Sequence, residues 1–346
     1  MAHKIALIGF GNVGQGLAEI LHIKGAGLRD TLGFEGQIVA VCTRSKGSLY
    51  HPAGLDAGRL LTLSQEQGTL SGYPDQPGLE RGWDAFKIIR ESNAESIVEI
   101  SPTNLENGQP ALDYCRAALE SGKNVVTANK GPVALALSEL TALAQAHGVR
   151  FAFEGTVMSG TPALRLPLAA LAGTEISEVR GILNGTTNYI LTKMEEGQSY
   201  AEALAEAQAL GYAETDPTAD VEGYDALSKV VILANVLMGV PLKKADVTCQ
   251  GISGLTQADI AAAKAEGKRW KLIGRVSRGG GWVQAGVAPE RLPLDDPLAS
   301  VMGATNAITY ETNLLGPITL VGAGAGRIET GYALLIDLIN IARGSV

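Results

Sequence analysis

The sequence lacks several features that would assign a protein to a particular class. Its three cysteines, Cys42, Cys115 and Cys249, form no CxxC pair, so we expect neither a disulfide framework nor a zinc site, and the reducing cytoplasm is the simplest compartment. No apolar run reaches the roughly 18 residues that a membrane-spanning helix needs. The formal net charge of −8 is opposite in sign to the surface that binds nucleic acid. We therefore expect neither a membrane nor nucleic acid as a partner.

Glycine and apolar side chains are abundant instead. The 346 residues include 43 glycines and are 46% hydrophobic, whereas only 5% are aromatic. Small residues of this kind let helices pack closely on sheets, and they also form ligand-binding turns. The length predicts about two domains, each with its own core.

The first 150 residues alternate apolar strands with helices. This order predicts a parallel sheet with right-handed crossovers. The stretch from 45 to 80 is rich in Gly, Ser, Pro and Gln and predicts loops with one short helix. Strands are expected at 4–8, 37–42, 97–101, 124–127 and 150–153, and helices after residue 13, from Pro110 to Gly122 and over 133–147.

The pattern changes after about residue 155 and indicates a second domain of mixed α+β type. Gly279-Gly280-Gly281 between two strands predicts a hairpin. A final amphipathic helix is expected over 327–342. The other strands are expected at 178–183, 271–277, 282–287, 304–312 and 318–321, and the other helices at 189–196, 200–210 and 225–238.

A GxGxxG motif follows the first strand and opens the first helix. Its glycines, Gly9, Gly11 and Gly14, allow a tight turn, close approach of backbone to a pyrophosphate and close packing of helix on strand. Asn12 and Val13 begin the helix, whose N-terminal N–H groups attract phosphate. In this context the motif predicts a dinucleotide site, although a purely structural turn is the alternative.

The end of the second strand indicates which dinucleotide is preferred. NAD-specific sites usually place an acid there, but this chain has Cys42-Thr43-Arg44-Ser45-Lys46. Arg44 can pair with a 2′-phosphate, so we expect NADP, with NAD use still possible. The alternative is that Arg44 is an ordinary surface arginine.

Several further segments carry polar residues in a distinctive order, from the N-terminal turn to the last helix. Together they resemble the homoserine dehydrogenase family over essentially the whole chain. The segments are Gly9-Phe10-Gly11-Asn12-Val13-Gly14, Glu99-Ile100-Ser101-Pro102-Thr103-Asn104, Val125-Val126-Thr127-Ala128-Asn129-Lys130-Gly131-Pro132, Phe153-Glu154-Gly155-Thr156-Val157, Leu183-Asn184-Gly185-Thr186-Thr187-Asn188-Tyr189-Ile190-Leu191, Gly211-Tyr212-Ala213-Glu214 with Asp216, Pro217, Asp220, Asp225 and Lys229, and Gly322-Ala323-Gly324-Ala325-Gly326.

The spacing of Asp225 and Lys229 puts both side chains on one face of a helix. From spacing alone, a common surface ion pair is an adequate explanation. The resemblance implies more, because the family's catalytic lysine falls on Lys229 and a substrate-holding carboxylate falls on Asp225. A lysine there can exchange a proton with an alcohol while hydride moves.

The resemblance also implies the remaining substrate and cofactor residues. Glu214 and Asp220 join Asp225 as counter-charges for the substrate's ammonium group, with Asp216 as a bystander; solvated acids in a turn are the alternative. Lys130 follows a strand, at the edge where α/β sheets bind ligands, and serves both cofactor and substrate unless it is a plain surface lysine. Ser101 and Gly326 are expected near the cofactor.

A monovalent-cation site, most simply for sodium, is implied at Glu154, Val157, Ser159 and Thr161. Hard cations prefer carboxylate and carbonyl oxygens of this kind. A buried structural Glu154 is an equal alternative. The polar run 184–188 orients substrate or simply caps a helix through Thr186 or Thr187.

The sequence thus predicts an α/β protein with a Rossmann-type parallel-sheet nucleotide domain at 1–150, completed by 322–346. A central α+β domain at 151–321 is expected to bind substrate, with the active site between the domains, and the resemblance alone implies that this domain forms a homodimer. The expected reaction interconverts aspartate semialdehyde and homoserine. No C-terminal regulatory domain and no fused kinase domain are expected. Another amino-acid dehydrogenase, or a redox sensor that binds NADP without turnover, is the rival hypothesis.

Overall fold

The computed structural model describes residues 2–344, and its contacts divide the chain into two compact units. The first contains the residues up to Gly160 and those from Gly326 onward, and the second is Thr161–Ala325. The first unit therefore includes 151–160 and excludes 322–325. Within the described residues no helix is long and apolar enough to cross a membrane.

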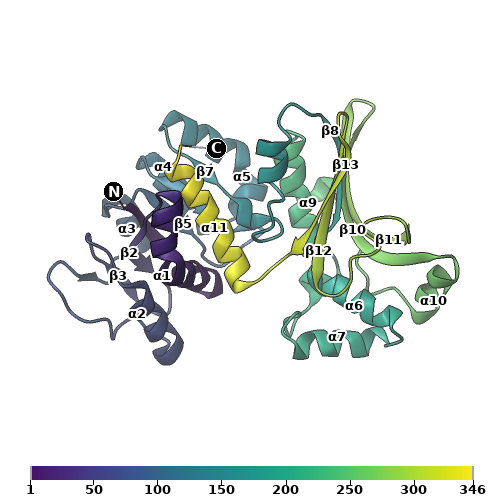
Figure 1. Ribbon diagram of the computed structural model, residues 1–346, viewed down its shortest axis with the longest axis horizontal. Coiled ribbons are helices and arrows are strands. Elements are labelled where there is room, and N and C mark those ends of the chain that lie inside the picture. Colours follow the sequence, from purple (N-terminus) through teal and green to yellow (C-terminus); the bar gives the residue numbers. More distant parts are fainter. Residues whose placement is uncertain (1, 345–346) are drawn as a thin grey trace. The chain divides into compact units, whose positions relative to one another are not determined.

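The first unit is built on a seven-stranded sheet in the order β4-β3-β2-β1-β5-β6-β7 (Figure 1). The five neighbouring strands β2, β1, β5, β6 and β7 are parallel. At one edge, β3 pairs antiparallel with β2, and β4 pairs antiparallel with β3. This confirms the Rossmann-type fold. The strands are β1 (His3–Ile8), β2 (Gly36–Cys42), β3 (Ser48–Tyr50), β4 (Glu80–Arg81), β5 (Ser96–Glu99), β6 (Asn124–Thr127) and β7 (Phe151–Ala152).

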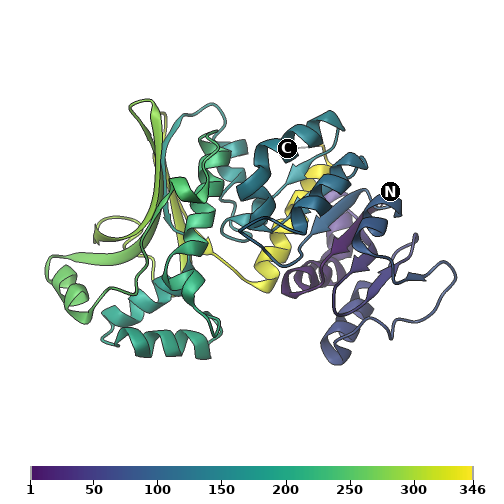
Figure 2. The same ribbon diagram turned by 180° about the vertical axis from the view of Figure 1, so that it is seen from behind.

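Helices cover both faces of this sheet because successive strand residues point to opposite sides. One apolar cluster joins Ile5 and Leu7 to α1 (Asn12–Leu32), α2 (Ala57–Thr62) and α11 (Arg327–Ala342). The other cluster joins the intervening strand residues to three more helices, α3 (Ala85–Glu91), α4 (Ala111–Glu120) and α5 (Lys130–Ala146). The chain's last helix thus completes the first unit, and Figure 2 shows the chain from behind.

Two sequence expectations in this unit were wrong. Residues 45–80 contain β3, the start of β4 and α2, which continues into a π-helical turn, Leu63–Gln67, so they hold more than loops and one helix. The helix expected to start at 133 starts at Lys130, because the Asn129 side chain accepts a hydrogen bond from Gly131 N (3.1 Å) and caps it.

The second unit is a six-stranded sheet in the order β13-β12-β8-β10-β11-β9. All pairs are antiparallel except β11 with β9. The expected hairpin is confirmed, since Gly280 and Gly281 have φ of +59° and +87° in the two-residue turn. The strands are β8 (Ile176–Ile182), β9 (Thr248–Cys249), β10 (Lys268–Gly279), β11 (Trp282–Pro293), β12 (Thr305–Thr312) and β13 (Gly316–Ala323).

Helices α6 (Gly185–Glu195) and α9 (Tyr224–Leu237) pack on strands of this sheet (Figure 1). A side chain at Gly274 of β10 would meet Leu183 and Val230, so α9 lies directly against the strand backbone there. The remaining helices are α7 (Tyr200–Ala209), α8 (Thr218–Val221) and α10 (Gln257–Ala265). Of these, α8 and α10 were not expected.

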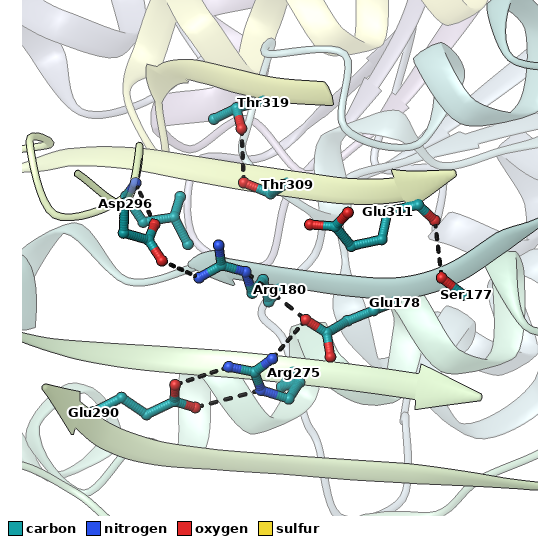
Figure 3. Close-up of polar contacts among 10 residues, drawn as sticks. Ser177, Glu178, Arg180, Arg275, Glu290, Asp296, Thr309, Glu311 and Thr319 are labelled. Atoms are coloured by element: carbon teal, nitrogen blue, oxygen red, sulfur yellow. Dashed lines mark hydrogen bonds and ion pairs between the residues drawn. The ribbon is translucent and has the colours of Figure 1, made fainter. Parts of the chain in front are cut away.

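Charged cross-strand pairs line the sheet face opposite Gly274 (Figure 3). Arg180 of β8 contacts Asp296 (2.7 Å), and Arg275 of β10 bridges Glu178 (2.5 Å) and Glu290 (2.8 Å). Arg180 and Arg275 are direct partners in the register of β8 and β10, so the carboxylates around them offset the repulsion between the two like charges.

Candidate active site

The nucleotide turn uses its glycines for different purposes. Gly9 has φ of +114°, and a Cβ there would lie 2.4 Å from the backbone oxygen of Ile100. Gly14 packs as closely, since its Cβ would lie 2.8 Å from the Ile100 side chain. Gly11 faces open space and is the N-cap of α1 without a side-chain cap bond. Asn12 and Val13 follow as the first residues of the helix, so their N–H groups point to the space beside Gly11.

The turn after β2 presents one exposed cation beside this space. Arg44 is exposed and contacts no carboxylate among the described residues. The Thr43 hydroxyl donates to Gly47 O (2.9 Å) and accepts from Lys46 N (2.7 Å), so it holds the turn and has no hydrogen left for a ligand. Arg44 and the exposed Ser45 hydroxyl are therefore the groups of this turn that remain available to a phosphate.

The carboxyl ends of β5 and β6 bring Ser101 and Lys130 onto neighbouring loops. Glu99 is fully buried and accepts from Ser101 N (2.9 Å), while Asn129 Nδ2 donates to Ser101 O (3.2 Å). Asn129 also caps the helix that begins at Lys130. Burial raises the pKa of the Glu99 carboxyl, although hydrogen bonds from Ser101, Thr127 and Asn129 oppose the rise.

Glu99 and Asn129 were not among the expected site residues. An acid at the end of an otherwise apolar strand was the available signal for Glu99, because an unpaired buried charge is costly. The helix cap at Asn129 could have been inferred from the Asn-Lys-Gly-Pro order.

The second unit holds an acidic cluster around one buried lysine. Lys229 of α9 is 7% exposed, and its Nζ donates to Asp225 Oδ2 (2.7 Å) and to Leu183 O (2.6 Å). Asn184 Nδ2 donates to Asp220 Oδ1 (2.7 Å) and to Asp225 Oδ2 (3.0 Å). The two carboxylates and the lysine thus share one hydrogen-bonded group, centred on Asn184.

The electrostatics of this cluster favour proton and cation binding. Burial raises the pKa of the Asp220 carboxyl, and the neighbouring Asp225 charge adds to the effect. The Asn184 hydrogen bond and the Lys229 charge oppose it without cancelling it. A positively charged ligand would relieve this repulsion.

Asn184 is also the cap of α6, where Thr186 or Thr187 had been expected. The Asn184 Oδ1 accepts from Thr187 N (2.9 Å), and α6 starts at Gly185. Thr186 instead donates to Tyr212 O (2.6 Å). The expected threonine cap was wrong because asparagine stands one residue before the helix and reaches the same N–H groups.

Other expected residues lie outside the acidic cluster. Glu214 is exposed, and its carboxylate contacts none of the cluster residues in the part of the chain described. Asp216 accepts from Thr218 N (3.1 Å) and Thr218 Oγ (2.6 Å) at the start of α8. Gly326 has φ of +140° and precedes α11 in the first unit.

The residues expected to hold a cation are mostly buried. Glu154, Val157 and Ser159 are 4%, 0% and 3% exposed, and Ser159 adopts a left-handed backbone with φ of 57°. Thr161 belongs to the second unit, where its hydroxyl donates to Ala323 O (3.1 Å). Among residues 2–344 no group of three His, Cys, Asp or Glu side chains could hold a metal ion.

Comparison with known proteins gives a consistent result. A family model described as homoserine dehydrogenase matches residues 162–339. An NAD(+)-dependent homoserine dehydrogenase from Pseudomonas canavaninivorans is 48% identical over 98% of this chain and 96% of its own length. A homoserine dehydrogenase from Methanocaldococcus jannaschii is 42% identical over 97% of this chain and 98% of its own. A hyperthermophilic archaeal homoserine dehydrogenase mutant, solved in complex with NADPH, has a TM-score of 0.85 at 31% identity and covers 100% of this chain and 99% of its own.

The half-buried acid Asp220 is expected to reduce stability at neutral pH. Its raised pKa means that its favourable contribution is complete below the pKa of the unfolded chain and is lost as pH rises through the folded pKa. Asp220→Asn should therefore raise the free energy of unfolding at pH 7, by less than about 2 kcal/mol. Urea denaturation should show the gain shrinking as pH falls toward about 4.

Asp216→Asn is the matched control, and it should change the free energy of unfolding in the opposite direction. Hydrogen bonds from Thr218 lower the pKa of Asp216, so its contribution is present at neutral pH and is lost on acidification. This variant should lower stability at pH 7. If both variants lowered it equally, the account of Asp220 as a destabilising buried charge would be wrong.

Proposed function

The chain belongs to the homoserine dehydrogenase family, and from that premise we propose which of its residues bind the cofactor, bind the substrate and move the proton. It is an NAD(P)-dependent oxidoreductase that interconverts L-aspartate 4-semialdehyde and L-homoserine by hydride transfer. The reaction supplies homoserine for threonine, methionine and isoleucine synthesis. The nicotinamide ring supplies or accepts the hydride. The protein must bind both ligands and move one proton.

We assign the proton to Lys229. An ammonium group has three N–H donors, and two of those on Lys229 are committed to Asp225 and to Leu183 O. One donor remains for the oxygen of the substrate, where it protonates the developing alkoxide in the reducing direction. This geometry is the observation that carries the assignment. Asp225 holds the lysine in place.

We assign the substrate's ammonium group to the carboxylates of the cluster. Asp220 and Asp225 both accept a hydrogen bond from the Asn184 amide, which brings their charges close together. An added cation would therefore lower their mutual repulsion. Glu214 is proposed as a third carboxylate from the exposed loop before α8. Lys130 is proposed to contact both cofactor and substrate from the start of α5.

The cofactor contacts are proposed at the first unit's turns. The N–H groups around Gly11, Asn12 and Val13 suit a pyrophosphate, because Gly11 leaves open space at the helix end. Gly9 and Gly14 shape that turn, and Ser101 and Gly326 are proposed as further contacts.

We propose NADP as the preferred cofactor, with NAD also accepted. Arg44 is exposed, and no acid stands at the end of β2 to bind a ribose hydroxyl. The archaeal relative was solved with NADPH, which agrees with this preference. The Pseudomonas relative is named as NAD(+)-dependent, which supports the alternative.

A monovalent cation, most simply sodium, is proposed at Glu154, Val157, Ser159 and Thr161. The donor chemistry fits, because Glu154 offers a nearly buried carboxylate and the turn at Ser159 offers backbone oxygens. Activity that is the same in sodium-free buffer would argue against it.

We also propose a cytoplasmic homodimer that forms through the unit after residue 150. Leu314, Leu315 and Val321 in that unit are 69%, 60% and 57% exposed, which suits a covered surface. The three cysteines are all free thiols, as expected in a reducing compartment. Light scattering that gave the mass of one chain would contradict the dimer, and fractionation of cells would test the compartment.

Lys229→Ala should abolish most turnover without loss of cofactor affinity. Removing the proton donor is expected to lower kcat/KM for homoserine by about 10²- to 10⁴-fold. The rate is followed as nicotinamide absorbance, and NADP affinity as quenching of protein fluorescence. Lys264→Ala, which removes an exposed lysine of α10, is the control and should retain the rate. Equal losses of rate and cofactor affinity in Lys229→Ala would show that its role is misassigned.

Arg44→Ala should separate the two cofactors. Losing a charged contact to the 2′-phosphate is expected to raise the KM for NADP by about 10- to 100-fold and to leave the KM for NAD within about twofold. Arg59→Ala, another exposed arginine of the same unit, should change neither. A wild-type enzyme that prefers NAD, or an equal effect on both cofactors, would contradict the NADP assignment.

A further inference from the structure

One buried carboxamide in the second unit has no hydrogen-bond partner. Asn306 of β12 is 0% exposed, and neither its Oδ1 nor its Nδ2 is bonded within the described residues. A buried polar group left unpaired costs about 1–3 kcal/mol, and native proteins contain few of them. A buried amide without a protein partner is the arrangement found where an ordered water or a ligand binds.

Two glycines let the Asn306 carboxamide pack directly against the backbone. A Cβ at Gly324 would come within 2.2 Å of Asn306 Nδ2, and a Cβ at Gly185 would lie 3.2 Å from Asn306 Oδ1. Any other residue at 324 would collide with the amide. The glycine-rich turn before α11 and the first residue of α6 therefore meet at Asn306.

The same end of α6 carries the acidic cluster. Gly185 follows Asn184, which holds Asp220 and Asp225, and the preceding Leu183 accepts from Lys229. The Asn184 side chain satisfies Thr187 N, whereas the first N–H groups of an 11-residue helix have no intrahelical partner. The positive end of the helix and an unpaired amide thus lie together, one residue from the cluster.

The substrate needs such a group. Homoserine is a zwitterion, and the cluster offers carboxylates for its ammonium group and Lys229 for its hydroxyl. Its α-carboxylate needs N–H donors away from those acids. The Asn306 amide, whose Oδ1 lies nearest Gly185 and whose Nδ2 lies against Gly324, stands beside this helix N-terminus and brings an N–H donor without introducing another charge.

We propose that Asn306 binds the α-carboxylate of the substrate through Nδ2, at the N-terminal turn of α6. This inference rests on the proposed function and adds a specificity-determining residue to it. Because the Gly324 backbone lies over the amide, binding at Asn306 requires that turn to move. Asn306 then excludes amino alcohols that lack a carboxylate.

The test compares ligands that keep or lack the carboxylate. Asn306→Asp is nearly isosteric but replaces the donor with an oxygen that repels the ligand. We expect it to raise the KM for homoserine by about 10- to 100-fold. The inhibition constant of 3-aminopropan-1-ol, which keeps the ammonium and hydroxyl groups, should stay within about twofold, as should NADP affinity.

Asn313→Asp is the charge-matched control. It lies just beyond the same strand, is exposed, and keeps the oxygen that accepts from Glu175 N. It should leave both constants unchanged. If Asn306→Asp raised the constants for homoserine and 3-aminopropan-1-ol together, or changed neither, the proposal would be overturned.

A second variant covers the case in which the aspartate variant does not fold. Asn306→Ser keeps a smaller donor, and it should weaken inhibition by 4-hydroxybutanoate, which keeps the carboxylate, more than inhibition by 3-aminopropan-1-ol. Equal weakening would overturn the proposal. A wild-type enzyme that does not oxidise homoserine would refute the proposed function itself, which is a distinct result.

Discussion

The chemistry of the second unit depends on the side chain of Asn184. Its amide nitrogen donates to two carboxylates, and its oxygen caps the helix that follows. One residue therefore fixes where Asp220 and Asp225 lie and where α6 begins. Without that donor, two acids would face each other in a partly buried space, and burial would favour protonation of one of them. We propose that this arrangement keeps two carboxylates in place for the ammonium group of the substrate.

In the first unit, the proposed ligand is an anion, and backbone N–H groups are proposed to bind it. The sheet of this unit ends in turns whose glycines leave main-chain N–H groups at an open helix end, and we propose that these groups and the exposed Arg44 bind the cofactor. Behind the turns, the buried Glu99 accepts from Ser101 N, and Asn129 starts the helix that carries Lys130. Ser101 and Lys130 are thus each positioned by a buried polar neighbour. Precise placement of this kind is what hydride transfer requires.

Much of this could be predicted from the sequence, because the signals were local. Strand periodicity, the GxGxxG turn and the last amphipathic helix gave the nucleotide fold, and the four-residue spacing of Asp225 and Lys229 gave their contact. Long-range partners were missed. Neither the bond from Asn184 to Asp220 nor the position of Asn306 against Gly324 leaves a trace in nearby sequence. Short elements such as α8 and β4 were missed because a segment of so few residues is too short to show a periodic pattern.

Carbon-13 NMR titration of the aspartate carboxyl groups tests the role of Asn184 most directly. The account predicts that Asp220 titrates above the ordinary range for aspartate, and that Asn184→Ala moves its pKa higher still, because the hydrogen bond that opposes the rise is gone. A pKa for Asp220 at or below the ordinary value, or one that does not change in the variant, would contradict the account.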